Sequence, residues 1–200
     1  MPKPKSDSKE RLIEAASRLF SQQGYQATGL SQIVEESGAA RGSVYFLFPD
    51  GKEGIAVEAI KQSSEQMRQL LNATSEPCST ISEWLRRICD VISARLQASG
   101  FRRGSPFAAV TMDAVNDESS RLGQVCHKAY EEWIQDTATI LNQKFGVEEE
   151  RASVLATSAI SAIEGALILS RAKQSTEPLT LVTRMLIEWV ESKMDEGTSA

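Results

Sequence analysis

The sequence has few of the residues that build catalytic or metal sites. Its 200 residues include one histidine and three cysteines, and no two cysteines stand in a CxxC spacing. An odd number of scattered cysteines argues against a disulfide framework and against a metal-ligand set. The motifs GxSxG, GxxxxGK[ST] and HExxH are also missing. The sequence therefore predicts no enzyme, no metal and no cofactor.

Long apolar runs are lacking as well. No uninterrupted apolar run approaches the roughly 18 residues that a membrane helix needs. The first residues, MPKPKSDSKE, lack the apolar middle of a secretory signal. We therefore expect a cytoplasmic protein without a membrane partner.

Positive charge is scarce over the chain, whose net charge is −5, yet it is unevenly spread. Residues 1–62 balance eight Lys/Arg against eight Asp/Glu, whereas residues 63–200 carry fourteen against nineteen. A polyanion would have to be bound by a local basic patch in the first third of the chain. The hydrophobic content of 41% is sufficient for an ordinary globular core.

Apolar residues recur with helical spacing through almost the whole chain, and no stretch alternates with period two. The pattern predicts an all-α protein of about nine helices. Their expected ranges are 9–23, 28–37, 41–48, 52–73, 79–99, 104–116, 119–145, 148–174 and 178–194. Thr28 is the expected N-cap of the second helix, because threonine hydroxyls accept hydrogen bonds from the free N–H groups there.

Residues 28–48 predict two short helices joined by a tight turn at Gly38. This is the helix-turn-helix arrangement, in which the second helix enters the major groove of DNA. Helix 41–48 is too short to be stable alone, so Val44 and Phe48 are expected to hold it against the core. The same geometry also occurs inside all-α proteins that never touch DNA.

The early and outer side of this second helix carries the candidate DNA-binding groups. Gly42 lets the backbone approach a ligand closely, and Ser43 and Tyr45 offer hydroxyl donors. Arg41 suits either a guanine edge or a phosphate, and the sequence leaves both possibilities open. Lys52 opens the next helix, whose free N–H groups also suit a phosphate.

The stretch LFSQQGYQATGLSQIVEESGAARGSVYFLFPDGKEGIAVEAI resembles the N-terminal DNA-binding domain of the TetR/AcrR family. The similarity covers about residues 9–60. It rests on an aromatic-Gly-aromatic helix end, a threonine, a glycine turn, Gly-Ser-aromatic, Phe-Pro and Lys-Glu, in that order. The resemblance implies a ligand-responsive repressor that binds a palindromic, double-stranded DNA operator as a homodimer. It implies DNA contacts by Thr28, Arg41, Gly42, Ser43, Tyr45 and Lys52, with Thr28, Tyr45 and Lys52 mainly on phosphates.

The chain departs from the family pattern at two points. Ala40 stands where a hydroxyl N-cap is common, and Phe46-Leu47 replaces a common His-His pair. The later segments GSPFAAVTMDA and AISAIEGALILSRA resemble the LmrA/YxaF-like branch across much of residues 100–190. The resemblance implies a DNA-binding domain in residues 1–52 and an effector-binding and dimerisation domain in residues 53–200.

The last two predicted helices carry apolar and small residues that suit either a subunit interface or an intramolecular core. The resemblance favours a four-helix dimer interface. Its candidate residues are Leu155, Ala159, Ala162, Ile163, Ala166, Leu167, Val182, Met185, Leu186 and Trp189.

A small-molecule effector that is largely apolar is expected to bind between the helices that precede them. Aromatic and methionine side chains suit such a pocket, although at helical spacing they also suit a plain core. The candidates for the effector pocket are Trp84, Arg102, Phe107, Met112, Tyr130, Trp133 and Arg171.

Two other functions are weighed against the repressor. One is a redox-sensing regulator, or an all-α interaction module, in which Cys78, Cys89 or Cys126 responds to oxidants. Cys126 also suits the role of a small buried hydrophobic residue. The other is an all-α enzyme that uses the same cavity, for which the sequence offers no catalytic constellation.

Overall fold

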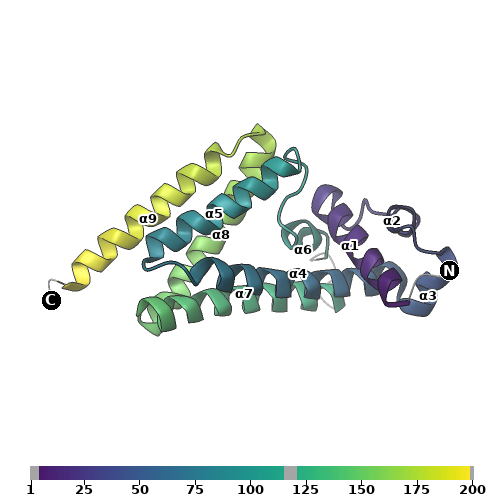
Figure 1. Ribbon diagram of the computed structural model, residues 1–200, viewed down its shortest axis with the longest axis horizontal. Coiled ribbons are helices and arrows are strands. Elements are labelled where there is room, and N and C mark those ends of the chain that lie inside the picture. The colour runs from purple at the N-terminus through teal and green to yellow at the C-terminus, as the bar shows by residue number, and fades with distance from the viewer. Residues whose placement is uncertain (1–4, 115–120, 199–200) are drawn as a thin grey trace. The chain divides into compact units, whose positions relative to one another are not determined.

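The computed structural model describes residues 5–114 and 121–198, which form nine α-helices and no strand (Figure 1). The all-α prediction is therefore confirmed for this part of the chain. In chain order the helices are α1 (Lys5–Gln23), α2 (Leu30–Ser37), α3 (Arg41–Leu47), α4 (Gly51–Ser75), α5 (Ile81–Ala98), α6 (Ala108–Ala114), α7 (Arg121–Phe145), α8 (Glu149–Lys173) and α9 (Glu177–Thr198).

Local chemistry explains where several helices begin and end. Gly38 adopts a left-handed conformation, with φ of 61°, and ends α2. Thr80 and Glu83 form a reciprocal capping box at the start of α5. The predicted cap at Thr28 is wrong, since Gly29 is the N-cap of α2 and supplies no side-chain hydrogen bond.

The chain divides into two compact units. One contains the described residues up to Glu65 together with those from Ser105 to Tyr130, and the other contains Gln66–Gly104 and the residues from Glu131 onward. Both α4 and α7 therefore contribute to each unit. The predicted functional boundary at residue 52 stays a prediction.

The first four helices all contribute to the core of the first unit. Leu12 of α1, Ile33 of α2, Val44 of α3 and Ile55 of α4 are each buried almost completely. Burial of these side chains stabilises α2 and α3, which are too short to persist alone.

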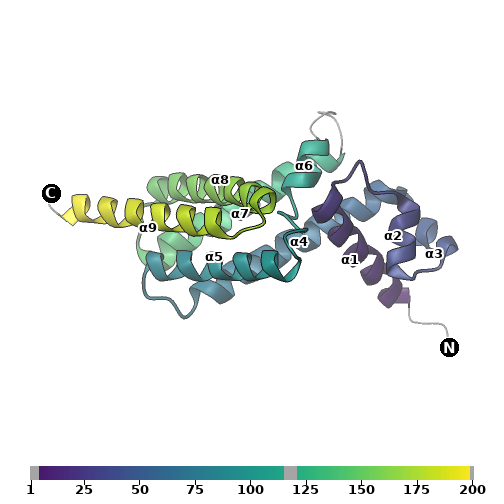
Figure 2. The ribbon, with the colours of Figure 1, turned by 90° about the horizontal axis from the view of Figure 1, so that it is seen from above.

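The core of the second unit lies where α9 packs beside α8 and α5 (Figure 2). By length and composition alone α8 is apolar enough to cross a membrane, which for a single helix is weak evidence. The core helices of soluble proteins pass the same test. Leu155, Ile163 and Leu167 of α8 are buried within the unit, so packing accounts for part of the apolar composition of α8.

Candidate functional site

Helices α2 and α3 form a pair joined by a three-residue turn. Gly38 donates its N–H to the carbonyl of Glu35, at 3.2 Å, and closes the end of α2. The guanidinium of Arg11 donates through Nη1 to the carbonyl of Ser37, at 2.8 Å, and so ties the same helix end to α1. The turn between the two helices is thus held by backbone geometry and by a long-range hydrogen bond.

The two faces of α3 have opposite character. Val44 and the C-cap residue Phe48 are buried, as the sequence predicted, and they fix the helix to its unit. On the other side Tyr45 is 64% exposed and Phe46 is 71% exposed. Arg41 is exposed as well. An α-helix with its side chains is about 10–12 Å in diameter, which fits a major groove about 12 Å wide.

Gly42 and Ser43 complete the exposed face of α3. A Cβ atom built on Gly42 would meet no atom within 4 Å, so the absence of a side chain leaves open space there. Ser43 is partly exposed. With Arg41, Tyr45 and Phe46, these residues form what we call the α3 face. Phe46 was not among the predicted contacts, since it stands where the family pattern commonly has a polar histidine.

At two predicted phosphate contacts the side chain is already hydrogen-bonded within the protein. Thr28 is 0% exposed, and its hydroxyl donates to the carbonyl of Gly24 at 2.7 Å. Lys52 donates from Nζ to the carbonyls of Tyr25 and Thr28, both at 3.1 Å. Both side chains hold the loop between α1 and α2, because the carbonyls of this tight loop need donors.

The environment of Lys52 is unusual for a lysine. Its ammonium lies 4.1 Å from the centre of the Tyr25 ring, a cation–π distance. Burial lowers the pKa of Lys52, and the negative charge of Asp113 partly opposes that change by raising it. Burial also raises the pKa of Tyr25, as does the nearby carboxylate of Glu53.

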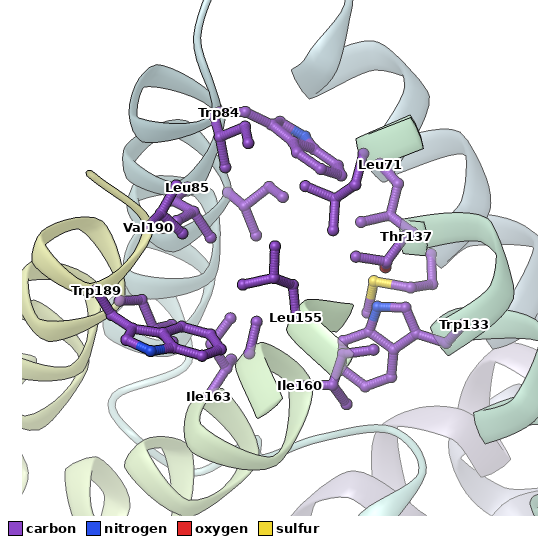
Figure 3. Close-up of a pocket in the computed structure, with 16 residues that line it drawn as sticks. Leu71, Trp84, Leu85, Trp133, Thr137, Leu155, Ile160, Ile163, Trp189 and Val190 are labelled. Carbon is purple, nitrogen blue, oxygen red and sulfur yellow. The ribbon is translucent and has the colours of Figure 1, made fainter. Parts of the chain in front are cut away.

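The second unit contains a cavity of about 40 Å³ (Figure 3). Side chains from α4, α5, α7, α8 and α9 line it, and most of them are aliphatic or aromatic. Thr137 is the only hydroxyl residue among them, and none of them is ionisable. The lining residues are Met67, Leu71, Ile81, Trp84, Leu85, Ile88, Trp133, Thr137, Leu141, Leu155, Ala159, Ile160, Ile163, Leu186, Trp189 and Val190.

Only two of the predicted effector residues, Trp84 and Trp133, line this cavity. Phe107 is buried in the first unit, where its ring lies 5.6 Å from that of Tyr130. Met112 is exposed on α6. These three residues lie outside the lining of the cavity, and their role in effector binding stays a prediction.

The two arginines predicted as polar anchors also lie outside the lining of the cavity. Arg171 donates through Nη2 to the backbone carbonyl of Arg102, at 3.0 Å. A Cβ atom on Gly104 would lie 2.9 Å from Nη1 of Arg171. The Arg171 guanidinium therefore packs closely against the segment that follows α5.

Half of the predicted dimer residues are buried within their own unit, and their assignment to a subunit interface stays a prediction. Packing among α5, α7, α8 and α9 already covers them: Leu155, Ile163, Ala166, Leu167 and Leu186. Ala159, Ala162, Val182 and Trp189 are partly exposed, and Met185 is exposed. The other apolar side chains that α8 and α9 expose were not predicted: Val154, Ile168, Leu169 and Leu181.

All three cysteines are buried and free. Burial raises the pKa of Cys89 and of Cys126, so their thiols stay protonated near neutral pH. The thiol of Cys78 donates to the carbonyl of Thr74, at 3.2 Å. Among the described residues no cluster of His, Cys, Asp or Glu is suited to hold a metal ion.

Two family models match the chain. The model described as bacterial regulatory proteins of the tetR family matches residues 12–59, which contain α2 and α3. The model described as the C-terminal domain of LmrA/YxaF-like transcriptional regulators matches residues 82–185.

Curated relatives are similar over nearly their whole length. The HTH-type transcriptional regulator LmrA of Bacillus subtilis is 36% identical over 86% of this chain and 91% of its own. YxaF of the same organism, an HTH-type transcriptional regulator, is 33% identical over 94% of this chain and 98% of its own.

Solved structures share the fold. A regulatory protein TetR from Rhodobacter sphaeroides has a TM-score of 0.79 at 21% identity, and the match covers 90% of this chain and 96% of the other. A TetR transcriptional regulator from Legionella pneumophila also has a TM-score of 0.79, at 23% identity over 90% and 95% of the two chains.

Proposed function

Because the chain belongs to the TetR family of bacterial transcriptional regulators, in its LmrA/YxaF-like branch, we propose that it is a cytoplasmic, ligand-responsive repressor. The family consists of transcriptional regulators and not of enzymes. In this proposal a homodimer binds a palindromic operator, and a small apolar effector releases it. The observation that carries the proposal is the α3 face, which stays exposed while Val44 and Phe48 anchor the helix from behind.

The α3 face has the groups needed for reading a major groove. The Arg41 guanidinium can donate two hydrogen bonds to one guanine edge or bind a phosphate. The Tyr45 hydroxyl suits a phosphate, and the exposed Phe46 ring suits the methyl group of a thymine. Thr28 and Lys52 act behind this face, since their contacts hold the loop that leads into α2.

The exposed apolar residues of α8 and α9 support the homodimer. Ile168 and Leu169 of α8 and Leu181 and Met185 of α9 are all well exposed in the single chain. Exposed apolar groups on neighbouring helices mark interaction surfaces. A two-fold axis through such a surface would present two α3 helices to a palindrome.

The cavity of the second unit is the proposed effector site, and α4 is the proposed lever. Met67 and Leu71 of α4 line the cavity, while the same helix begins at Gly51, four residues after α3 ends. A ligand that widens the cavity would favour dimers in which the two α3 helices no longer match the groove spacing. The buried, protonated cysteines give no support to the redox alternative.

Selection of bound fragments from the genome that encodes the chain tests this proposal. We expect wild type to enrich fragments that share a palindromic motif. The folded double variant Arg41→Ala/Tyr45→Ala should enrich none. Arg87→Ala, which removes an exposed positive charge on α5, serves as the matched control and should enrich the same motif. The proposal fails if wild type enriches no common sequence.

A further inference from the structure

The cavity of the second unit has a wall of unusual composition. All three tryptophans of the chain, Trp84, Trp133 and Trp189, line it. Figure 3 shows their indole rings on different sides of the space, with aliphatic side chains between them. Aromatic walls favour flat aromatic ligands, because offset and edge-to-face ring contacts add to apolar burial.

The hydroxyl of Thr137 is the exception in this wall. Thr137 is 7% exposed, and its Oγ1 has no hydrogen-bond partner within the part of the chain that the structure describes. Buried polar groups are normally paired. The indole N–H of Trp84 follows that rule, since it donates to Oγ1 of Thr74 at 3.1 Å. Thr137 thus brings an unused donor and acceptor to the edge of the cavity.

We propose that Thr137 is the hydrogen-bonding anchor of the effector site, and that its hydroxyl selects uncharged ligands carrying a hydroxyl or carbonyl group over otherwise identical ligands that lack one. The inference rests on the proposed function in taking this cavity as the effector site. A charged ligand is disfavoured because no ionisable side chain lines the cavity, and a buried charge without a partner is costly.

The volume of the cavity adds a condition on binding. The space measures about 40 Å³, whereas pockets that hold drug-sized ligands measure roughly 300–1,000 Å³. A ligand with two fused rings therefore has to move side chains of the wall. Met67 is suited to this, because it is only partly buried and its unbranched chain adapts its shape readily. Binding would then act directly on α4.

Three probes with one ring skeleton test the proposal: naphthalene, 2-naphthol and 2-naphthoate. Their binding to the purified chain, without DNA, is measured by calorimetry and by the change in tryptophan emission. Since every tryptophan lines the cavity, the emission reports binding there. We expect 2-naphthol to bind about three- to tenfold more tightly than naphthalene, the gain typical of one hydrogen bond. We expect 2-naphthoate to bind most weakly.

The isosteric variant Thr137→Val isolates the role of the hydroxyl. It should bind naphthalene as wild type does and should lose the preference for 2-naphthol. Thr183→Val is the matched control, because Thr183 is also buried in the second unit, lies outside the cavity lining, and donates its hydroxyl to the carbonyl of Leu179. It should keep the preference, provided that thermal unfolding shows both variants to be folded.

Three results would overturn the inference: equal affinity of wild type for naphthalene and 2-naphthol, an unchanged preference in Thr137→Val, or no binding of any probe. Because the titrations contain no DNA, they are independent of the selection experiment. A chain that binds the probes as expected but selects no DNA would retain the Thr137 site and lose the repressor function. The reverse result would retain the repressor and remove the site.

Discussion

The backbone N–H of Gln26 donates to Oδ2 of Asp113, with 2.9 Å between nitrogen and oxygen. This bond links α6 to the loop between α1 and α2, within one compact unit. Gly24 stands close by, since a Cβ atom at that position would lie 2.9 Å from the same Oδ2. Lys52 donates to two carbonyls of the same loop, so an acidic and a basic side chain together hold the segment that leads into α2.

Asp113→Ala should loosen this loop. A hydrogen bond to a charged acceptor contributes roughly 1.5–3 kcal/mol when well shielded, and this one is exposed, so we expect a loss of about 1 kcal/mol. For a chain of this length the melting temperature should fall by about 2–4 °C. Asp113→Asn keeps an oxygen acceptor and should recover part of the loss. Equal melting temperatures for wild type and Asp113→Ala would show that the bond does not stabilise the loop.

Truncation should lower stability on the buried face of α3 and weaken DNA binding on its exposed face. Val44→Ala removes two buried methyl groups and should lower the free energy of unfolding by about 2 kcal/mol. Phe46→Ala removes an exposed ring and should change the free energy of unfolding by less than about 0.5 kcal/mol, while weakening binding to the selected DNA. Urea unfolding and DNA titration of both variants separate the two effects. A large stability loss in Phe46→Ala would place that ring in the core instead.

The helices and the helix-turn-helix pair could be predicted from sequence because both rest on local signals. The spacing of apolar residues and the presence of a glycine at residue 38 can both be recognised within a short stretch of the sequence. The role of a side chain in tertiary packing leaves no such local signal. Thr28 and Lys52 both suit phosphates by type, yet each donates to a backbone carbonyl, Thr28 to nearby Gly24 and Lys52 to Thr28, 24 residues earlier in the chain.

The cavity illustrates the same limit. Trp84 and Phe107 are both aromatic residues on or beside predicted helices, but only Trp84 lines the cavity, and Phe107 is buried in the other unit. Helical periodicity identifies a buried face without identifying what covers it. Thr137 could not have been selected from sequence, because its distinguishing property is the absence of a partner for a buried hydroxyl among the described residues.

Ile168→Glu should dissociate the proposed homodimer. Ile168 is 63% exposed in the single chain, so a glutamate there should not disturb its own fold, but in an apolar interface it would bury an unpaired charge. We expect the dimer dissociation constant to rise by at least about tenfold. Sedimentation velocity over a concentration series measures it, with the exposed α7 change Gln143→Glu as control. A dimer equally stable in Ile168→Glu would place the interface elsewhere.

The cysteine thiols should be unreactive in the folded protein. Since burial raises the pKa of both Cys89 and Cys126, each has less reactive thiolate at a given pH than an exposed cysteine. Reaction with a disulfide reagent at pH about 7.5 should be slow, become faster as pH rises towards the ordinary thiol pKa and beyond, and become complete on unfolding. Peroxide should leave DNA binding unchanged. Peroxide-dependent release that Cys126→Ser abolishes would revive the redox alternative.

The central claim, that the α3 face reads DNA, is tested most directly by fluorescence anisotropy of the selected palindrome and of a scrambled duplex across a salt series. Wild type should prefer the palindrome, with log K falling by about 0.9 per phosphate contact for each unit of log salt concentration. Arg41→Ala should lose about 1–3 kcal/mol. If Arg41 contacts a base, the loss falls on the palindrome alone; if it contacts a phosphate, both duplexes weaken and the slope falls by about one. Unchanged affinity and slope in both Arg41→Ala and Tyr45→Ala would contradict the account.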